Sequence, residues 1–240
     1  LRPRVRHPPG AVGRAAGPVL KFGAASRGVL ALAERFGWRP GARYTNLRDV
    51  KTVPRLGFLD INWKRYDFRK HLAAARATQP YVTVAEDIVR YDQVDRILDQ
   101  ARELSRWCGH VIVVPKSPRV GREIDALIPE EFLLGYSVPT RYGGTRIPVS
   151  SFTRPVHLLG GRPDTQRRLA GQMPVVSMDC NRFTLDAAFG DYFDGETFRP
   201  HPAGGYGRCL EDSLRNIPRL WDSYEAPMEI ALWRTLRVAA

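Results

Sequence analysis

The sequence has no long hydrophobic run. Its 240 residues contain no stretch of about eighteen consecutive apolar residues, the length that a membrane-spanning helix requires. The first residues have neither the apolar segment nor the small-residue cleavage site of a secretory signal. We therefore expect a protein that has no membrane partner.

Cysteine is scarce as well. Cys108, Cys180 and Cys209 are odd in number and far apart in the chain, which argues against a disulfide framework and against a zinc site of the CxxC type. This usage fits the reducing cytoplasm, where we expect the protein to be. The apolar fraction of 43% and the aromatic fraction of 10% are nevertheless high enough for a full hydrophobic core.

Acidic residues are almost missing from the first 55 residues. This segment has twelve Lys and Arg against two acids, a charge of 12 − 2 = +10, whereas the whole chain carries +12. A coding bias toward Arg is one explanation, but it would spread Arg evenly and would not remove acids. The asymmetry favours a segment that lies on the phosphates of a nucleic acid. The residues expected to contact the nucleic acid are Arg2, Arg4, Arg6, Arg14, Arg27, Arg39 and Arg43.

From residue 56 onward, short apolar runs alternate with segments of helical period. The runs lack strict apolar–polar alternation, which is typical of strands that are buried on both faces. Helical segments are expected at Asp67–Thr78, Tyr91–Cys108 and Asp164–Gly171. The expected strands are Leu56–Ile61, Tyr81–Ala85, His110–Val114, Phe132–Tyr136, Val156–Leu159 and Val175–Met178.

This repetition of strand and helix selects a parallel sheet. No glycine-rich nucleotide-binding motif follows any of the runs, so the sequence does not indicate a nucleotide cofactor, and we prefer a (β/α)8 TIM-like barrel to an open doubly wound sheet. An earlier strand is expected at Val19–Phe22, with a helix around Val29–Phe36. An eighth strand is not evident, which leaves open an irregular or incomplete last strand.

The same pattern divides the chain into three parts. Residues 1–55 are expected to form a basic N-terminal segment with the first strand and helix of the barrel. Residues 56–200 would form the barrel core with the active site, and residues 201–240 a C-terminal loop and helical segment that packs on the barrel.

Polar residues follow most of the apolar runs, at the strand ends where barrel enzymes carry their function. Asp60 and Asp179 each lie in an otherwise apolar run, where a functional acid is more expected than a helix cap. Two carboxylates across one cavity can serve as nucleophile and as general acid/base, as in glycosidic-bond chemistry. His157 can equally be a core histidine, and Lys116 can equally hold a structural carboxylate. The candidate substrate-binding residues are Asp87, Lys116, Gly135, Tyr136, Ser137, His157, Gly160, Gly161 and Asn181.

Residues 130–183 carry a resemblance to a known family. They read EEFLLGYSVPTRYGG and then RPVHLLGGRPDTQRRLAGQMPVVSMDCNRF. This order resembles the queuine-type tRNA-guanine transglycosylases, in which a Gly-Tyr strand, a Pro-His-Leu-Gly strand and a strand ending in Asp-Cys follow one another. The resemblance extends back to residue 56. It implies that Asp179 is the nucleophile, that Asp60 is the general acid/base, and that Asp87, or Glu86 beside it, recognises the base.

Two departures from that family bear on the substrate. The Gln expected in the base-binding strand is replaced by the region Pro115–Lys116, and the zinc subdomain of the tRNA enzymes has no counterpart beyond Cys209 and His201. The chain therefore looks more like the compact phage-type relatives that act on DNA. The resemblance implies exchange of guanine, in DNA rather than tRNA, for a 7-deazaguanine base such as 7-cyano-7-deazaguanine, through a covalent Asp–glycosyl intermediate and without a metal.

Two other functions stay open at this stage. One is a metal-dependent barrel hydrolase or lyase that acts on a small anionic metabolite, with the acids as metal ligands. The other is a basic DNA-binding protein built on a barrel that has no catalytic activity.

Overall fold

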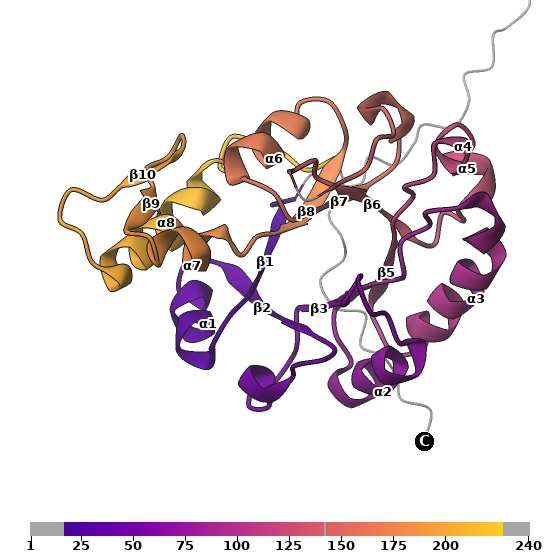
Figure 1. Ribbon diagram of the computed structural model, residues 1–240, viewed down its shortest axis with the longest axis horizontal. Coiled ribbons are helices and arrows are strands. Elements are labelled where there is room, and N and C mark those ends of the chain that lie inside the picture. The colour runs from indigo at the N-terminus through magenta and orange to yellow at the C-terminus, as the bar shows by residue number, and fades with distance from the viewer. Residues whose placement is uncertain (1–16, 142, 228–240) are drawn as a thin grey trace, which may run out of the picture.

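The computed structural model describes residues 17–141 and 143–227 of the chain. Eight parallel strands follow one another around a closed barrel, and β8 pairs with β1 to complete it. Helices lie around the outside of the barrel (Figure 1). The predicted (β/α)8 TIM-like barrel is therefore confirmed. The strands are β1 (Leu20–Ala24), β2 (Trp38–Arg43), β3 (Phe58–Asp60), β4 (Val82–Val84), β5 (His110–Val113), β6 (Leu133–Ser137), β7 (Val156–Leu159) and β8 (Val175–Asp179).

All six apolar runs and the expected earlier strand are strands of this barrel. The helices expected from periodicity are present as well, and α2 begins where its cap predicts, because the Asp67 carboxylate accepts a hydrogen bond from the Lys70 backbone N–H at 3.1 Å. The helices between strands are α1 (Arg27–Glu34), α2 (Phe68–Thr78), α3 (Val94–Ser105), α4 (Pro118–Gly121), α5 (Ile124–Leu127) and α6 (Pro163–Leu169). Three short 3-10 turns lie at Arg48–Val50, Tyr91–Gln93 and Val149–Ser151.

The expectation of an incomplete last strand is wrong. The strand that the sequence did not reveal is the second one, β2, whose sequence WRPGAR contains two arginines, a proline and a glycine and forms no apolar run. It pairs with β1 on one side and with β3 on the other. Gly41 lets β2 approach β1 closely, since a Cβ there would lie 3.2 Å from the Gly23 carbonyl oxygen.

The barrel interior is packed directly beneath the strand ends. Side chains two residues apart on a strand face the same side, so residues one step below the mouth fill the interior. Phe22, Phe58 and His157 form a layer there, with ring centroids of neighbouring pairs 5.2 to 6.0 Å apart. They come from β1, β3 and β7, in agreement with the rule that alternate strands supply one layer.

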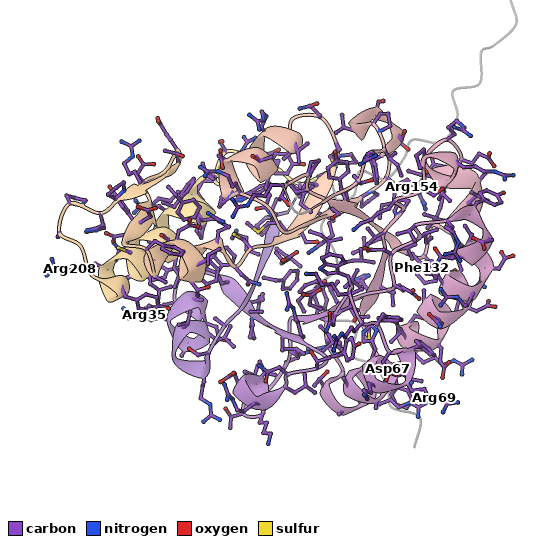
Figure 2. The ribbon with its side chains drawn as sticks, viewed as in Figure 1. Arg35, Asp67, Arg69, Phe132, Arg154 and Arg208 are labelled. Carbon is purple, nitrogen blue, oxygen red and sulfur yellow. The ribbon has the colours of Figure 1, made fainter. Side chains whose placement is uncertain are left out.

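The chain after β8 forms a small unit against one side of the barrel, next to α1 (Figure 1). The Trp38 indole N–H donates to the Leu214 carbonyl at 3.0 Å, and the Arg215 guanidinium lies 5.3 Å from the Phe36 ring centroid. Figure 2 shows Arg35 and Arg208 in this region. The unit contains α7 (Arg182–Ala187), β9 (Asp191–Phe193), β10 (Phe198–Pro200) and α8 (Tyr206–Arg219).

None of the helices in the described part of the chain has the length and apolar character needed to cross a membrane.

Candidate active site

The carboxyl ends of the strands surround a cavity of about 650 Å³. That volume lies within the usual range for small-molecule sites. Asp60 at the end of β3 and Asp179 at the end of β8 both line it. Two acids that are far apart in the sequence are therefore brought to one site, as the sequence predicts. The other lining residues are Arg43, Ile61, Trp63, Val84, Asp87, Lys116, Ser137, Val138, Thr140, Gly143, Gly144, Leu159, Gly160, Gly161, Asn181, Arg182, Thr184 and Leu185.

Asp179 is held by hydrogen bonds to one of its two carboxylate oxygens. Oδ1 accepts from the Gly160 backbone N–H at 3.0 Å and lies 3.3 Å from His157 Nε2. An ionised carboxylate only accepts hydrogen bonds, so this contact requires the His157 proton on Nε2. In the neutral imidazole with its proton on Nε2, Nδ1 accepts from the Ser177 hydroxyl, 2.8 Å away. Among the described residues Oδ2 receives no hydrogen bond, which leaves that oxygen available for reaction.

Asp60 lies in a different electrostatic environment. Burial, followed by the negative charge of Asp179, raises the pKa of Asp60 from 3.8 to about 7. The Ile61 backbone N–H donates to Oδ1 at 2.8 Å, and Arg43 lies 3.5 Å from Oδ2; both contacts oppose the increase in pKa. Near neutral pH a substantial fraction of Asp60 therefore carries a proton, as a general acid requires.

Gln166 on α6 fixes the backbone around Asp179. Its side-chain NH₂ donates to the carbonyl oxygens of Gly160 and Asp179, at 2.8 Å in both cases. Gln166 is fully buried, so α6 holds the ends of β7 and β8 together. Asn181 connects the site to the first strand, because its Oδ1 accepts from the Ala24 N–H at 2.8 Å.

Asp87 and Lys116 form an ion pair inside the cavity, with 2.6 Å between the carboxylate and the ammonium group. Burial raises the pKa of Asp87, and the charge of Lys116 opposes that rise. Glu86 instead pairs with Arg96 on α3 at 2.8 Å. Of the two acids that the sequence left open as base-recognising residues, Asp87 is therefore the one that faces the cavity.

The candidate substrate-binding residues fall into two groups. Asp87, Lys116, Ser137, Gly160, Gly161 and Asn181 line the cavity. Gly135, Tyr136 and His157 do not: a Cβ on Gly135 would lie 2.6 Å from Ile112 Cγ2, Tyr136 packs edge-on against Phe152, and His157 is buried beneath Asp179. These three residues support the site from behind its wall.

The arginines expected to bind nucleic acid are spread over the molecule. Arg43 lines the cavity. Arg27 is the exposed first residue of α1, which follows the carboxyl end of β1, and it therefore lies on the same side of the barrel as the cavity. Arg39 lies near the opposite, amino-terminal end of β2. The remaining four, Arg2, Arg4, Arg6 and Arg14, lie outside the described residues.

Trp63, Arg182 and Gln166 are among the residues of the site that escaped the sequence interpretation. Trp63 lines the cavity only three residues after Asp60, Arg182 lines it at the start of α7, and Gln166 holds its backbone. Trp63 could have been predicted from the sequence, because it lies in the loop just after an expected strand. Gln166 was not, because the carbonyls it binds are brought to it only by the fold. Within the described residues, no three His, Cys, Asp or Glu side chains gather in a way that could hold a metal ion.

Comparison with known proteins supports the fold and assigns a family. The structure is similar to the crystal structure of the YdjI aldolase from Escherichia coli K12, with a TM-score of 0.51, 10% sequence identity, and coverage of 86% of this chain and 92% of that chain. At that identity the likeness concerns the fold alone. No curated protein matches the sequence. A family model matches residues 33–222, which include the barrel from just before β2 to beyond α8. The chain therefore belongs to DUF6610, a family of unknown function.

Proposed function

We propose that the protein is a glycosyltransferase that exchanges guanine in a nucleic acid for a 7-deazaguanine base. The observation that carries this proposal is the pair Asp60 and Asp179, which line one cavity in different protonation environments. The resemblance of residues 56–183 to guanine transglycosylases supports the same roles for the two acids.

In the first half of the reaction, Asp179 Oδ2 attacks C1′ of the target nucleotide. The C1′–N9 bond breaks, its electron pair leaves with guanine, and the proton of Asp60 neutralises the departing base. The target nucleotide must leave the base stack for this attack, since C1′–N9 is inaccessible inside a duplex. The hydrogen bonds from Gly160 and His157 to Oδ1 orient the carboxylate for the attack.

In the second half, the incoming 7-deazaguanine displaces the Asp179 carboxylate from C1′. Its N9–H proton passes to Asp60, N9 attacks C1′, and the bond to Asp179 Oδ2 breaks. Asp60 thereby regains its proton and Asp179 its negative charge, so both residues return to their starting states. One glycosidic bond replaces another, and the exchange needs no redox cofactor and no nucleotide hydrolysis.

DNA is the favoured substrate, with the cations of the cavity as phosphate contacts. Arg43 and Arg182 line the mouth, and the charge of +10 in residues 1–55 out of +12 in total would add attraction for a polyanion without reading sequence.

Incorporation of labelled guanine into DNA by the purified protein tests the proposal. Asp179→Asn should abolish incorporation and leave DNA binding intact, whereas Asp99→Asn, at an exposed acid on α3 that pairs with Arg102, should react normally. With the incoming base withheld, mass spectrometry should detect a protein–DNA adduct on Asp179. Undiminished exchange by Asp179→Asn would exclude Asp179 as the nucleophile, and tRNA as an alternative substrate in the same assay would decide between the two nucleic acids.

A second candidate is a barrel hydrolase or lyase for a small anionic metabolite. The cations Arg43, Lys116 and Arg182 around the cavity favour an anionic ligand of either kind. Loss of activity on a phosphorylated or carboxylated metabolite after treatment with a chelator, together with no affinity for DNA, would support this function against the first.

A further inference from the structure

The loop after β3 places an exposed tryptophan at the rim of the cavity. Trp63 is 57% exposed, whereas Trp38 and Trp221 are 2% and 3% exposed. It lines the same cavity as Asp60. A large aromatic ring that stays in water at the entrance to a site is available to a ligand, and Trp is the residue type with the largest stacking surface.

Three partly buried hydrogen bonds hold the part of the loop that follows Trp63. The Tyr44 hydroxyl donates to the Arg65 carbonyl at 3.1 Å and accepts from the Asp67 N–H at 2.9 Å. The Tyr66 hydroxyl lies 3.1 Å from Nδ1 of the buried His71. Asp67 then caps α2, the helix start that Figure 2 marks with Asp67 and Arg69. Trp63 is therefore presented from a fixed base, and little ordering is needed before a ligand stacks on it.

Cations lie on this loop and on the neighbouring strand. Lys64 Nζ lies 5.3 Å from the centroid of the Trp63 ring, and Arg65, the next residue in the chain, is exposed. Among the described residues neither Lys64 nor Arg65 forms an ion pair with an acid. Arg43, with a side chain 58% exposed, lines the cavity from the neighbouring strand. An aromatic face bordered by cations is the arrangement by which proteins bind single-stranded nucleic acid.

We infer that the loop Ile61–Asp67 binds a single-stranded segment of the nucleic acid beside the target nucleotide, with a base stacked on Trp63 and phosphates against Lys64 and Arg65. This inference rests on the proposed function for what enters the cavity. The binding itself needs no reaction. A base that is already unpaired stacks on the ring, so the contact favours single strands over duplex.

Fluorescence anisotropy with a labelled single-stranded DNA oligonucleotide and with the same sequence in a hairpin duplex tests the inference. Trp63→Ala should weaken single-strand binding at least fivefold, as expected for the loss of one base–aromatic contact, and should change duplex binding much less. Trp63→Phe should recover most of the affinity. Phe189→Ala is the matched control, because Phe189 is also exposed, at 77%, and does not line the cavity; its affinity should equal that of the wild type.

Lys64→Ala and Arg65→Ala should each lower the slope of log affinity against log salt concentration, because each removes a phosphate contact. Wild-type affinity in Trp63→Ala, equal losses on single strand and duplex, or equally strong competition by polyglutamate would each overturn the inference. Because the assay contains no incoming base, its result is independent of the exchange reaction: Trp63-dependent binding without any exchange would refute the proposed function alone.

Discussion

At the residue scale, the raised pKa of Asp60 links the site to the stability of the protein. The folded protein holds this proton more tightly than the unfolded chain between the usual pKa of 3.8 and about 7. In that interval the unfolded state binds fewer protons, so the free energy of unfolding falls as the pH rises. The carboxylate of Asp60 is thus a cost to folding above about pH 7, on the order of a few kcal/mol at most.

Asp60→Asn should remove this cost, since the amide has nearly the same shape and no charge. The free energy of unfolding of Asp60→Asn minus that of the wild type should grow as the pH rises from about 4 to about 7 and stay constant above. Urea denaturation over this pH series measures the difference. Asp99→Asn serves as the control and should show no comparable trend. A difference that is flat across the interval would contradict the raised pKa.

The residues of the site differ in how far the sequence can specify them. Asp60 and Asp179 were predictable, because an acid inside an apolar run needs a reason to be there. The choice between Glu86 and Asp87 was not, since it depends on which side chain faces the cavity and which faces Arg96. His157 was predicted as a substrate-binding residue. It lies at the site, but it contacts Asp179 from below instead of lining the cavity.

At the element scale, strands with an apolar run were predictable and β2 was not. Its Pro40 and Gly41 are unfavourable in strands by composition, and its place between β1 and β3 is decided by pairing partners far along the chain. Arg43 reaches the cavity because β2 ends beside β3, with Arg43 aligned to Asp60. The sequence interpretation assigned Arg43 to a basic segment and so missed its contact with Asp60.

The loop between β7 and α6 also depends on a contact that is distant in the sequence, and this contact requires glycine. Gly161 has φ +88°, and a Cβ there would lie 2.5 Å from Val138 Cγ1. Gly161→Ala should therefore combine left-handed strain with a steric clash, destabilising the protein by about 2–4 kcal/mol. Gly190→Ala has a similar φ of +83° and no atom within 4 Å of the new Cβ, so it should cost only about 1–2 kcal/mol.

Thermal and urea denaturation of the two variants measure the comparison. Base exchange by Gly161→Ala should fall as well, because the neighbouring Gly160 N–H donates to Asp179. Equal destabilisation of the two variants would mean that Val138 moves aside without cost.

At the scale of the whole molecule, the uneven distribution of charge predicts how nucleic-acid binding depends on salt concentration. The N-terminal arginines are expected to hold the polymer through its phosphates, so changing them should reduce the salt dependence of binding and leave the chemistry untouched. Replacing Arg2, Arg4 and Arg6 together by Gln lowers the net charge from +12 to 12 − 3 = +9. For each of the three that contacts a phosphate of single-stranded DNA, the slope of log affinity against log salt concentration should shrink by roughly 0.7.

The matched control replaces Arg35, Arg106 and Arg168 by Gln, which gives the same net charge. These exposed arginines lie at the carboxyl ends of α1, α3 and α6, the helix ends farthest from the barrel mouth in this fold; Figure 2 shows Arg35 there on α1. A general effect of net charge would lower the slope equally in both triple variants. A basic segment that lies on the nucleic acid would lower it in the N-terminal variant alone, and the rate of base exchange at saturating DNA should then be the same in all three proteins.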